Sequence, residues 1–366
     1  MTGGTTGGHV NPAIAIANYI KEKEPNSEIA FVGTSKGIEN KLVPKAGYEL
    51  YHVEIQGLRR KLTLENIKTA WLTLTSVKKA EKLIKTFKPD LVIGTGGYVC
   101  WPVVRAAAKL KIPAFLHESN AVPGVAVKML EKYAKIVFTN FEVTKDFLKY
   151  KEKAVRVGNP LIGDFAVLDK TDCRKKLGIE GKYRHFILSC GGSMGAEKIN
   201  EAVIDFMKTY TSKHPEILHI HASGAIEYEA AKKRFDENGL AGRGNCVLAE
   251  YIYDMPEKMT AADVVINRAG AMTLSELALK KKPCVLIPSP NVTNNHQFKN
   301  AKVLSDAGAA ILIEESELSK ERLESEIDKL FKDKELQRTM GENIGKFACP
   351  EACELIYSKI KALVNE

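Results

Sequence analysis

Several short stretches of the chain combine glycine with side chains that can bind anions or move protons. The chain begins with the letters MTGGTTGGHV, in which four glycines precede His9. Glycine lets backbone approach a ligand closely, and unpaired N–H groups at the start of a helix can hold a phosphate. A neutral imidazole titrates near the pH at which most enzymes work. His9 is therefore a candidate general base, or alternatively a donor within a phosphate-binding loop.

Three further glycine-rich stretches follow predicted strands. They read GTGGY (94–98), GGSMGAEKIN (191–200) and NRAGAMTLSE (267–276). None matches the dinucleotide fingerprint or the P-loop, so each alone is also compatible with a tight turn from a strand into a helix. In the third stretch, Thr273, Ser275 and Glu276 fall in the first turns of the predicted helix. A carboxylate there can hold ribose hydroxyls while N–H groups hold phosphate, or it can serve only as a helix cap.

Short apolar runs alternate with helical patterns along the whole chain. This alternation predicts the α/β class, with parallel sheets that are covered by helices on both faces. We expect strands at EIAFVGT, DLVIGTGG, PAFLHESN, KIVFTNF and AVRVGNP in the first half, and at HFILSCGGS, EILHIHASG, NCVLAEYI, ADVVINRAG, PCVLIPSP and AAILIEE in the second. Ligands of such sheets bind beyond the carboxyl ends of the strands, which is where the polar clusters of this chain fall.

The stretch from Gly158 to Phe165 interrupts this rhythm with glycine and proline. We place the domain boundary there, which predicts two Rossmann-like domains, residues 1–158 and 159–345, that face each other across a cleft. The last segment, 346–366, is predicted to form a helix that packs back on the first domain. Asn11 as an N-cap and Pro12 at the first helical position predict where the first helix begins.

The first half lacks one strand that the second half has. HFILSC precedes the glycine loop of the second half, whereas only Met1 and Thr2 precede that of the first. In a doubly wound sheet this strand is central, with a neighbour on each side. Its absence would leave two strand edges unpaired, at about 1–3 kcal/mol for each buried unsatisfied backbone group. We therefore expect a few further apolar residues before Met1 in the natural product.

The composition narrows the class of protein. The 366 residues are 45% hydrophobic and 27% charged, as in globular proteins, and no apolar run approaches the roughly 20 residues that cross a bilayer. Seven scattered cysteines predict reduced thiols. The net charge of +9 favours a diphosphate substrate or an anionic membrane, or reflects solvated surface lysines. Nucleic acid is disfavoured, because only 7% of the residues are aromatic and no recognition motif is present.

Eight motifs together carry a resemblance to a known family. In order they are GGTTGGHV, GTGGYV followed by proline, HESN followed by PG, GNP, GGSMGA followed by IN, EYIYDM, RAGAMTLSE and NNHQFKNA. This series is similar to that of the MurG glycosyltransferases over nearly the whole chain. The resemblance implies the GT-B fold and the transfer of N-acetylglucosamine from UDP-N-acetylglucosamine to undecaprenyl-pyrophosphoryl-N-acetylmuramyl-pentapeptide in peptidoglycan synthesis, by a peripheral protein at the cytoplasmic face of the cell membrane.

The resemblance assigns donor-side roles where a motif matches. It implies that Glu276 holds the ribose hydroxyls and that Ile252 meets the uracil through its backbone. The residues that it places toward the phosphates and the sugar are Thr6, Gly7, Gly8, Asn120, Ser193, Ala271, Met272, Thr273, Leu274, Ser275, His296 and Gln297. His296 departs from the more usual pair of glutamines, and Ile162 stands where some members of the family carry an arginine toward the nucleotide.

On the acceptor side the resemblance implies roles for Tyr98, His117 and Asn200, with Glu118 as the second candidate base after His9. Many sugar-nucleotide transferases hold a metal with an Asp-x-Asp motif, but no two aspartates of this chain are two positions apart. Helix N-termini can stabilise a leaving diphosphate instead. We therefore expect catalysis without a metal or any other cofactor.

A lipid-linked acceptor requires a surface that meets the membrane. Apolar residues recur at helical spacing with cations around them, at Leu64, Ile67, Trp71 and Leu74 and at Arg59, Arg60, Lys61, Lys68, Lys78 and Lys79. This pattern suits an interfacial helix on an anionic membrane, although a helix that faces the core has the same spacing.

Two alternatives keep the fold and change the reaction. One is a UDP-sugar epimerase, and the other is a glycolipid synthase that uses a different acceptor.

Overall fold

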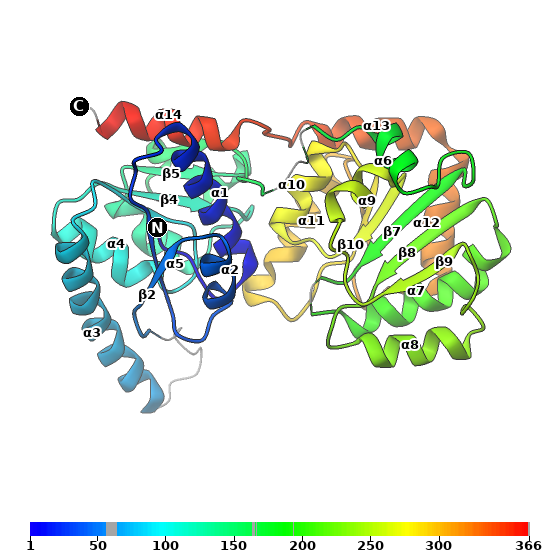
Figure 1. Cartoon of the computed structure of the whole chain (residues 1–366), viewed down its shortest axis with the longest axis horizontal. Helices are drawn as coiled ribbons and strands as arrows, with labels where there is room; N and C mark the ends of the chain where they lie inside the picture. The colour runs from blue at the N-terminus through cyan, green and yellow to red at the C-terminus, as the bar shows by residue number, and fades with distance from the viewer. Residues whose placement is uncertain (56–63, 163–164, 166, 193, 365–366) are drawn as a thin grey trace. The chain divides into compact units, whose positions relative to one another are not determined.

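The computed structural model describes residues 1–55, 64–162, 165, 167–192 and 194–364, without the side chains of residues 64–74. The chain divides into two compact units (Figure 1). The first unit comprises Met1–Ile162 and Cys349–Glu366, and the second comprises Gly163–Ala348. The sequence analysis predicted divisions after residues 158 and 345, and the two units of the structure divide after residues 162 and 348.

The second unit is built on a parallel sheet. Its strands are β7 (His185–Cys190), β8 (Ile217–Ala222), β9 (Cys246–Ala249), β10 (Val264–Asn267), β11 (Cys284–Leu286) and β12 (Ile311–Leu312). Their order across the sheet is β12-β11-β10-β7-β8-β9, and every pairing is parallel. This is the doubly wound order, in which the chain leaves β7 in one direction and β10 in the other.

Helices cover both faces of this sheet (Figure 1). They are α6 (Lys170–Lys176), α7 (Glu197–Thr209), α8 (Tyr228–Glu237), α9 (Met255–Ala261), α10 (Ala271–Leu279), α11 (His296–Asp306), α12 (Lys320–Lys332) and α13 (Lys334–Gly345). The strands are buried apolar runs, as expected for a parallel sheet that is covered on both sides.

The first unit contains two parallel sheets. The strands are β1 (Ala30–Gly33), β2 (Glu49–His52), β3 (Val92–Gly94), β4 (Ala114–Glu118), β5 (Ile136–Thr139) and β6 (Ala154–Arg156). β1 pairs with β2, and β3, β4, β5 and β6 form the second sheet in that order. The helices are α1 (Gly7–Lys23), α2 (Glu39–Lys45), α3 (Leu64–Phe87), α4 (Cys100–Lys109), α5 (Val125–Leu130) and α14 (Ala352–Val364).

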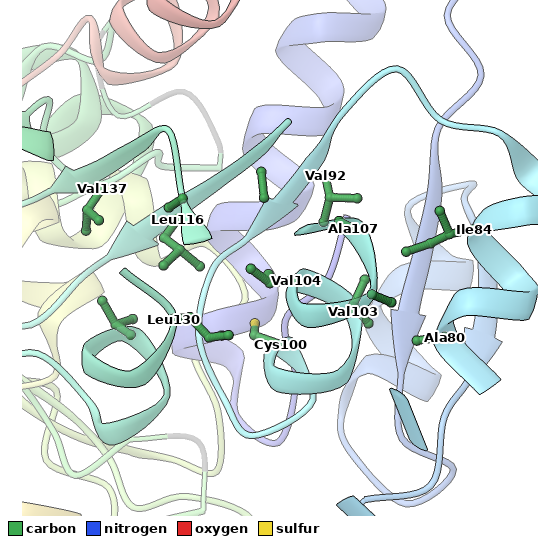
Figure 2. Close-up of a cluster of buried hydrophobic side chains, with 14 of the residues drawn as sticks. Ala80, Ile84, Val92, Cys100, Val103, Val104, Ala107, Leu116, Leu130 and Val137 are labelled. Carbon is green, nitrogen blue, oxygen red and sulfur yellow. The ribbon is translucent and has the colours of Figure 1, made fainter. Parts of the chain in front are cut away.

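The first two residues of the chain lie between these two sheets. Thr2 makes isolated parallel bridges to Val32 of β1 and to Gly94 of β3. Thr2 thus lies between β1 and β3, where the central strand of a doubly wound sheet would lie. The core around β3 and β4 includes Val92 and Leu116, which pack with α4 residues such as Val104 (Figure 2).

The C-terminal helix α14 packs on the first unit. Ile356 and Ile360 are buried in one cluster with Ile16 of α1. At the edge of this contact the Lys361 ammonium lies 2.7 Å from the Glu24 carboxylate, and the Tyr357 hydroxyl donates to the same carboxylate at 2.8 Å. The last segment therefore belongs to the first unit.

Two local predictions were wrong. β2 was not foreseen, because ELYH is short and mostly polar at its ends. The first helix begins at Gly7 rather than after Asn11, with Thr6 in the extended N-cap conformation. Glycine has a low intrinsic helix propensity, so the sequence favoured a later start. No described helix is long and apolar enough to cross a membrane.

Candidate functional site

The switch point of the second unit brings two strand-end loops together. β7 and β10 are direct neighbours, with Cys190 opposite Asn267 at their carboxyl ends. β7 leads into the glycine loop that begins at Gly191, and β10 leads into Arg268–Gly270 before α10. Ligands of open parallel sheets bind in the crevice at this position. The fold therefore brings Gly191 and Gly192 next to the loop Arg268–Gly270, although these residues lie far apart in the sequence.

The glycine loop after β7 touches the loop after β8. Gly224 has a positive φ of 84°, and a Cβ atom there would lie 2.1 Å from the Gly195 nitrogen. A Cβ atom on Gly195 would in turn lie 2.3 Å from the Ser223 oxygen. No larger residue fits either position without moving the other loop. This close approach fixes the loop that leads into α7.

A chain of buried polar side chains lies beneath this loop. The Ser189 hydroxyl is 2.7 Å from His219 Nε2 and 2.9 Å from His221 Nδ1. His221 Nε2 is 3.0 Å from Asn200 Oδ1, and the Asn200 amide donates to the Ser223 oxygen at 3.0 Å. Burial lowers the pKa of His221 to about 4, and burial together with the neighbouring His221 lowers the pKa of His219. Both rings are therefore neutral at pH 7.

The position of Asn200 gives no support to the expected contact with the acceptor. Its side chain is 3% exposed, and both ends of its amide are bonded within the second unit. The geometry instead makes Asn200 a link between α7 and the loop after β8. The sequence contained the His-x-His pattern of β8, but nothing in that pattern indicated Ser189 as the partner.

The loop before α10 is held from three sides. The Arg268 guanidinium lies 2.5 Å from the Glu315 carboxylate and donates to the Ile287 oxygen at 3.1 Å. The Asn300 amide, fully buried on α11, donates to the Ala269 oxygen at 3.3 Å. The first N–H groups of α10 are thereby presented at the switch point, where a helix N-terminus attracts negative charge. The sequence singled out NNHQFKNA but gave Asn300 no role.

Glu276 lies in the second turn of α10 and is mostly enclosed. No hydrogen bond from its carboxylate is found among the described residues. Burial raises the pKa of this carboxyl to about 7. A partly ionised carboxylate without a protein partner is a typical feature of a binding site, because a ligand with hydroxyl groups can supply the missing donors.

The other residues of the second unit that were predicted to contact the donor differ in their burial and in their hydrogen bonds. Ser193 lies outside the described residues. Ile252 is 5% exposed, so its side chain is buried. His296 Nδ1 donates to the Thr293 oxygen at 2.8 Å, and Gln297 Oε1 accepts from the Ser289 nitrogen at 2.9 Å. These bonds fix the start of α11. Thr273 and Ser275 are partly buried on α10.

His9 is held by the first glycine loop of the first unit. Its Nδ1 lies 3.0 Å from the Gly4 oxygen, which can only accept, so the proton is assigned to Nδ1. Nε2 then carries the lone pair. Burial lowers the pKa of His9, although the bond to Gly4 and the charge of Glu39 oppose this shift. A neutral ring with an unprotonated Nε2 is the form that a general base requires.

Two glycine loops of the first unit also touch each other. The Gly4 nitrogen donates to the Gly96 oxygen at 3.4 Å. Gly97 has a φ of +83°, and a Cβ atom there would lie 2.7 Å from the Gly4 oxygen. A Cβ atom on Gly96 would lie 2.5 Å from the His9 ring. The loops TGGTTGGH and GTGGY therefore require glycine in order to seat His9. Thr6, Gly7 and Gly8 are accessible at the start of α1.

Glu39 is a buried carboxylate that the sequence analysis missed. It accepts from the Thr5 and Thr34 nitrogens, both at 2.9 Å, and from the Thr34 hydroxyl at 2.8 Å. Burial raises the pKa of Glu39, but these hydrogen bonds more than offset it and hold the pKa below its usual value. Glu39 thus fixes the first glycine loop through Thr5. Its place at the start of α2, just after Gly37, was the available signal.

His117 and Glu118, at the end of β4, form hydrogen bonds mainly with neighbouring backbone groups. His117 is fully buried, and its Nε2 lies 2.8 Å from the Gly158 oxygen. Burial lowers its pKa to about 4. The Glu118 carboxylate accepts from the Asn120 nitrogen at 2.9 Å and from the Gly124 nitrogen at 2.8 Å. His117 therefore cannot contact an acceptor directly in this structure. The Glu118 carboxylate is hydrogen-bonded within its own loop.

Tyr98 and Asn120 are partly buried and remain candidates for ligand contact. The Asn120 amide donates to Glu118 at 3.0 Å. Ile162 is 42% exposed. The side chains of the expected membrane patch from Arg59 to Leu74 lie outside the described residues. Its last two cations, Lys78 and Lys79, are exposed on α3.

Comparison with known proteins identifies the family. Residues 1–139 match the model of the glycosyltransferase family 28 N-terminal domain, and residues 186–356 match that of the C-terminal domain. A relative from Thermoanaerobacter sp. (strain X514) is 42% identical over 363 residues, 99% of both chains. One from Acetivibrio thermocellus is 41% identical, over 100% of this chain and 98% of its own. Both are named UDP-N-acetylglucosamine–N-acetylmuramyl-(pentapeptide) pyrophosphoryl-undecaprenol N-acetylglucosamine transferase.

The chain belongs to glycosyltransferase family 28, and within it to the MurG family. The crystal structure of Acinetobacter baumannii MurG matches it with a TM-score of 0.78 and 29% identity, over 99% of this chain and 98% of that one. The UDP complex of Staphylococcus aureus MnaA matches with a TM-score of 0.69 at 18% identity, covering 100% of this chain and 95% of MnaA, which shows a shared fold only. The expected two-domain GT-B architecture is confirmed for this MurG-family chain.

Substitution of Gly97 tests whether the close contact of the two loops matters in this MurG-family chain. Gly47 is the matched control, because its φ of +84° is close to the +83° of Gly97 but its Cβ would meet nothing within 4 Å. Gly47→Ala should cost about 1–2 kcal/mol of unfolding free energy, the cost of the left-handed conformation. Gly97→Ala should cost about 1–3 kcal/mol more, because the new methyl group collides with Gly4. Urea unfolding measures both, and equal losses would show that the loops are not in tight contact.

Proposed function

We propose that this chain transfers N-acetylglucosamine from UDP-N-acetylglucosamine to the 4-hydroxyl of the lipid-linked N-acetylmuramyl-pentapeptide, with inversion at the anomeric carbon. The observation that carries this proposal is the full-length similarity to relatives that are named for this reaction, at 42% identity. The geometry of the described residues supports a sugar-nucleotide site in the second unit and a candidate base in the first.

The proposed donor site lies at the switch point of the second unit. The N-termini of α7 and α10 present N–H groups there, which favour a diphosphate. Glu276 would accept hydrogen bonds from the two ribose hydroxyls, and the backbone at Ile252 would meet the uracil. His296 and Gln297, at the start of α11, would contact the sugar hydroxyls.

The proposed reaction is a single displacement. The acceptor hydroxyl oxygen attacks the anomeric carbon, and the bond from that carbon to the diphosphate oxygen breaks, so that UDP leaves with the electron pair. The hydroxyl proton passes to His9 Nε2. Helix N-termini stabilise the charge that develops on the diphosphate, which is the role that a metal plays in other transferases.

We further propose that the enzyme acts as a peripheral protein at the cytoplasmic face of an anionic membrane. The acceptor named in the relatives carries an undecaprenol lipid, so its sugar must be reached at a bilayer surface. The net charge of +9 favours adsorption to anionic lipid. The stretch from Leu64 to Leu74 is the sequence candidate for the apolar contact.

Product analysis tests the reaction directly. Radiolabelled UDP-N-acetylglucosamine should yield a labelled lipid product only when the lipid-linked acceptor is present, and turnover should persist in EDTA. Loss of turnover in EDTA that magnesium or manganese restores would contradict the metal-free mechanism. Conversion of the donor to an epimer without the acceptor would favour the epimerase alternative.

Glu276→Gln should weaken the binding of UDP and, at the same time, raise the stability of the folded chain. The raised pKa means that the folded chain binds this proton more tightly than the unfolded chain, so the carboxyl lowers stability as the pH rises from about 4.5 through about 7. At pH 8 the variant should therefore unfold at a higher temperature than the wild type, yet bind UDP about tenfold or more weakly, because a charge-assisted hydrogen bond is lost.

The affinity of the wild type for UDP should also rise between pH 6 and pH 8, because only the ionised carboxylate accepts from both hydroxyls. Titration calorimetry measures this dependence. The control is Glu180→Gln, at an exposed glutamate in a turn of the second unit, which should leave both properties unchanged. UDP affinity that is independent of pH in the wild type would reject the ribose role.

His9→Gln should lower kcat by about 10²–10⁴-fold if His9 is the base, with little change in the KM for the donor. The lowered pKa predicts that wild-type kcat/KM falls only at pH values below the usual imidazole range. In the His9→Gln variant, kcat/KM should no longer show this fall at low pH. His214→Gln, at a partly exposed histidine of the second unit, is the control. A rise in donor KM with unchanged kcat would instead assign His9 to phosphate binding.

A further inference from the structure

Strands β7 and β8 bury polar side chains that the proposed reaction does not use. Ser189 of β7 and His219 and His221 of β8 have no exposed surface, and Asn200 of α7 is 3% exposed. The two strands are parallel neighbours in the second unit (Figure 1), with Ser189 paired to His221. Buried polar groups cost free energy unless each has a hydrogen-bond partner. The donors and acceptors of these side chains are therefore tightly constrained.

The bond from Asn200 to Ser223 fixes the direction of the hydrogen bonds. The Ser223 carbonyl oxygen can only accept, so Asn200 Nδ2 lies toward it, at 3.0 Å. Asn200 Oδ1 then faces His221 Nε2 at 3.0 Å, and because this oxygen also only accepts, the proton of the ring must be on Nε2. Burial lowers the pKa of both His221, to about 4, and His219, so each ring carries one N–H at pH 7. His221 Nδ1 is therefore an acceptor.

The Ser189 hydroxyl supplies the hydrogen bond that His221 Nδ1 needs. It lies 2.9 Å from that nitrogen and 2.7 Å from His219 Nε2. A hydroxyl donates one hydrogen bond, so Ser189 donates to His221 and accepts from His219, whose proton is then also on Nε2. The Thr211 hydroxyl, 3.4 Å from His219 Nδ1, is the first donor. All these bonds run in one direction. We call the set the polar series; in order it is Thr211, His219, Ser189, His221 and Asn200.

A second acceptor near His221 makes the Ser189 hydroxyl decisive. The Ser189 carbonyl oxygen lies 3.3 Å from His221 Nδ1. A ring protonated on Nδ1 could donate to this oxygen, but its Nε2 lone pair would then face Asn200 Oδ1, which is also an acceptor. Because the hydroxyl donates to Nδ1, the proton stays on Nε2. Ser189 therefore selects the tautomer that holds Asn200.

The polar series ends at the glycine loop after β7. The Asn200 N–H donates to the oxygen of Ala196, the N-cap residue of α7, at 2.9 Å. Ser223 directly precedes Gly224, whose backbone packs against Gly195. Asn200 thus joins the start of α7 to the loop that packs on the glycine loop. The first N–H groups of α7 have no partner within the helix, and this link fixes where they point.

We propose that Ser189 and His221 are positioning residues for the donor diphosphate: the Ser189 hydroxyl keeps His221 protonated on Nε2, and this ring holds Asn200 and the glycine loop in place. The inference rests on the proposed transferase function, which places the diphosphate at helix N-termini of the second unit. Both side chains are fully buried, so they act through Asn200 and do not touch the ligand.

Nitrogen-15 NMR of the full chain with labelled histidine tests the tautomers without any ligand. His221 should show the neutral Nε2–H pattern between pH 6 and pH 8, and the signals that His221→Gln removes identify this ring. In Ser189→Ala the hydroxyl is absent, so the His221 signals should shift toward the Nδ1–H pattern, with the backbone oxygen at position 189 as acceptor. An Nδ1–H pattern in the wild type, or an unchanged pattern in Ser189→Ala, would overturn the proposal.

Titration calorimetry with UDP tests the positioning role. His221→Leu removes the hydrogen bonds to Asn200 and Ser189, so it should weaken UDP binding about tenfold or more and speed hydrogen exchange of the Gly195 and Gly224 amides. His221→Gln offers an N–H to Asn200 and should recover most of the affinity. Ser189→Ala should also weaken UDP binding, but it should have no further effect when added to His221→Leu, because both act through one ring.

Leu330→Ala is the control for a general loss of stability. Leu330 is fully buried on α12 in the core of the second unit and is not a member of the polar series. This variant should lower the thermal midpoint, as His221→Leu does, but leave UDP affinity and exchange of the two glycine amides unchanged. UDP binding that His221→Leu leaves intact would refute the positioning role alone. Failure of the wild type to bind UDP would refute the proposed function, and the diphosphate role with it.

Discussion

The structure depends on close contact between the backbones of neighbouring loops that lead into helices. In the first unit Gly97 meets the Gly4 oxygen, and in the second Gly224 meets the Gly195 nitrogen. A methyl group at any of these contacts would separate the loops. Because each loop leads into a helix, the contact fixes where the N–H groups of that helix point. In both units, close packing of glycine residues therefore fixes the positions of the helix N-termini.

Buried titratable groups surround these loops, and their charge states follow from burial. His221 and His117 are neutral and serve as internal hydrogen-bond links. Glu39 remains ionised because backbone N–H groups surround its carboxylate. No such donor to Glu276 is found in the part of the chain that the structure describes, and burial raises its pKa to about 7. This contrast separates groups that hold the scaffold from a group that a ligand can stabilise.

The sequence predicted the fold class and every strand of the second unit, because continuous apolar runs with polar ends are a strong signal for buried parallel strands. It missed β2, whose ends are polar, and placed the start of α1 too late, because contacts of Gly4 and His9 outweigh the low helix propensity of glycine. It predicted a site at the strand ends but not the links through Glu39, Ser189 and Asn300. Such links depend on which strands become neighbours, and a local pattern does not contain that information.

The central claim is that the second unit binds the nucleotide at the β7/β10 switch point. The most direct test is a crystal structure of the chain with UDP-N-acetylglucosamine. We expect the ribose hydroxyls within hydrogen-bond distance of the Glu276 carboxylate and the diphosphate at the N–H groups that begin α7 or α10. A nucleotide bound away from these helix ends, with Glu276 free of the ribose, would contradict the account.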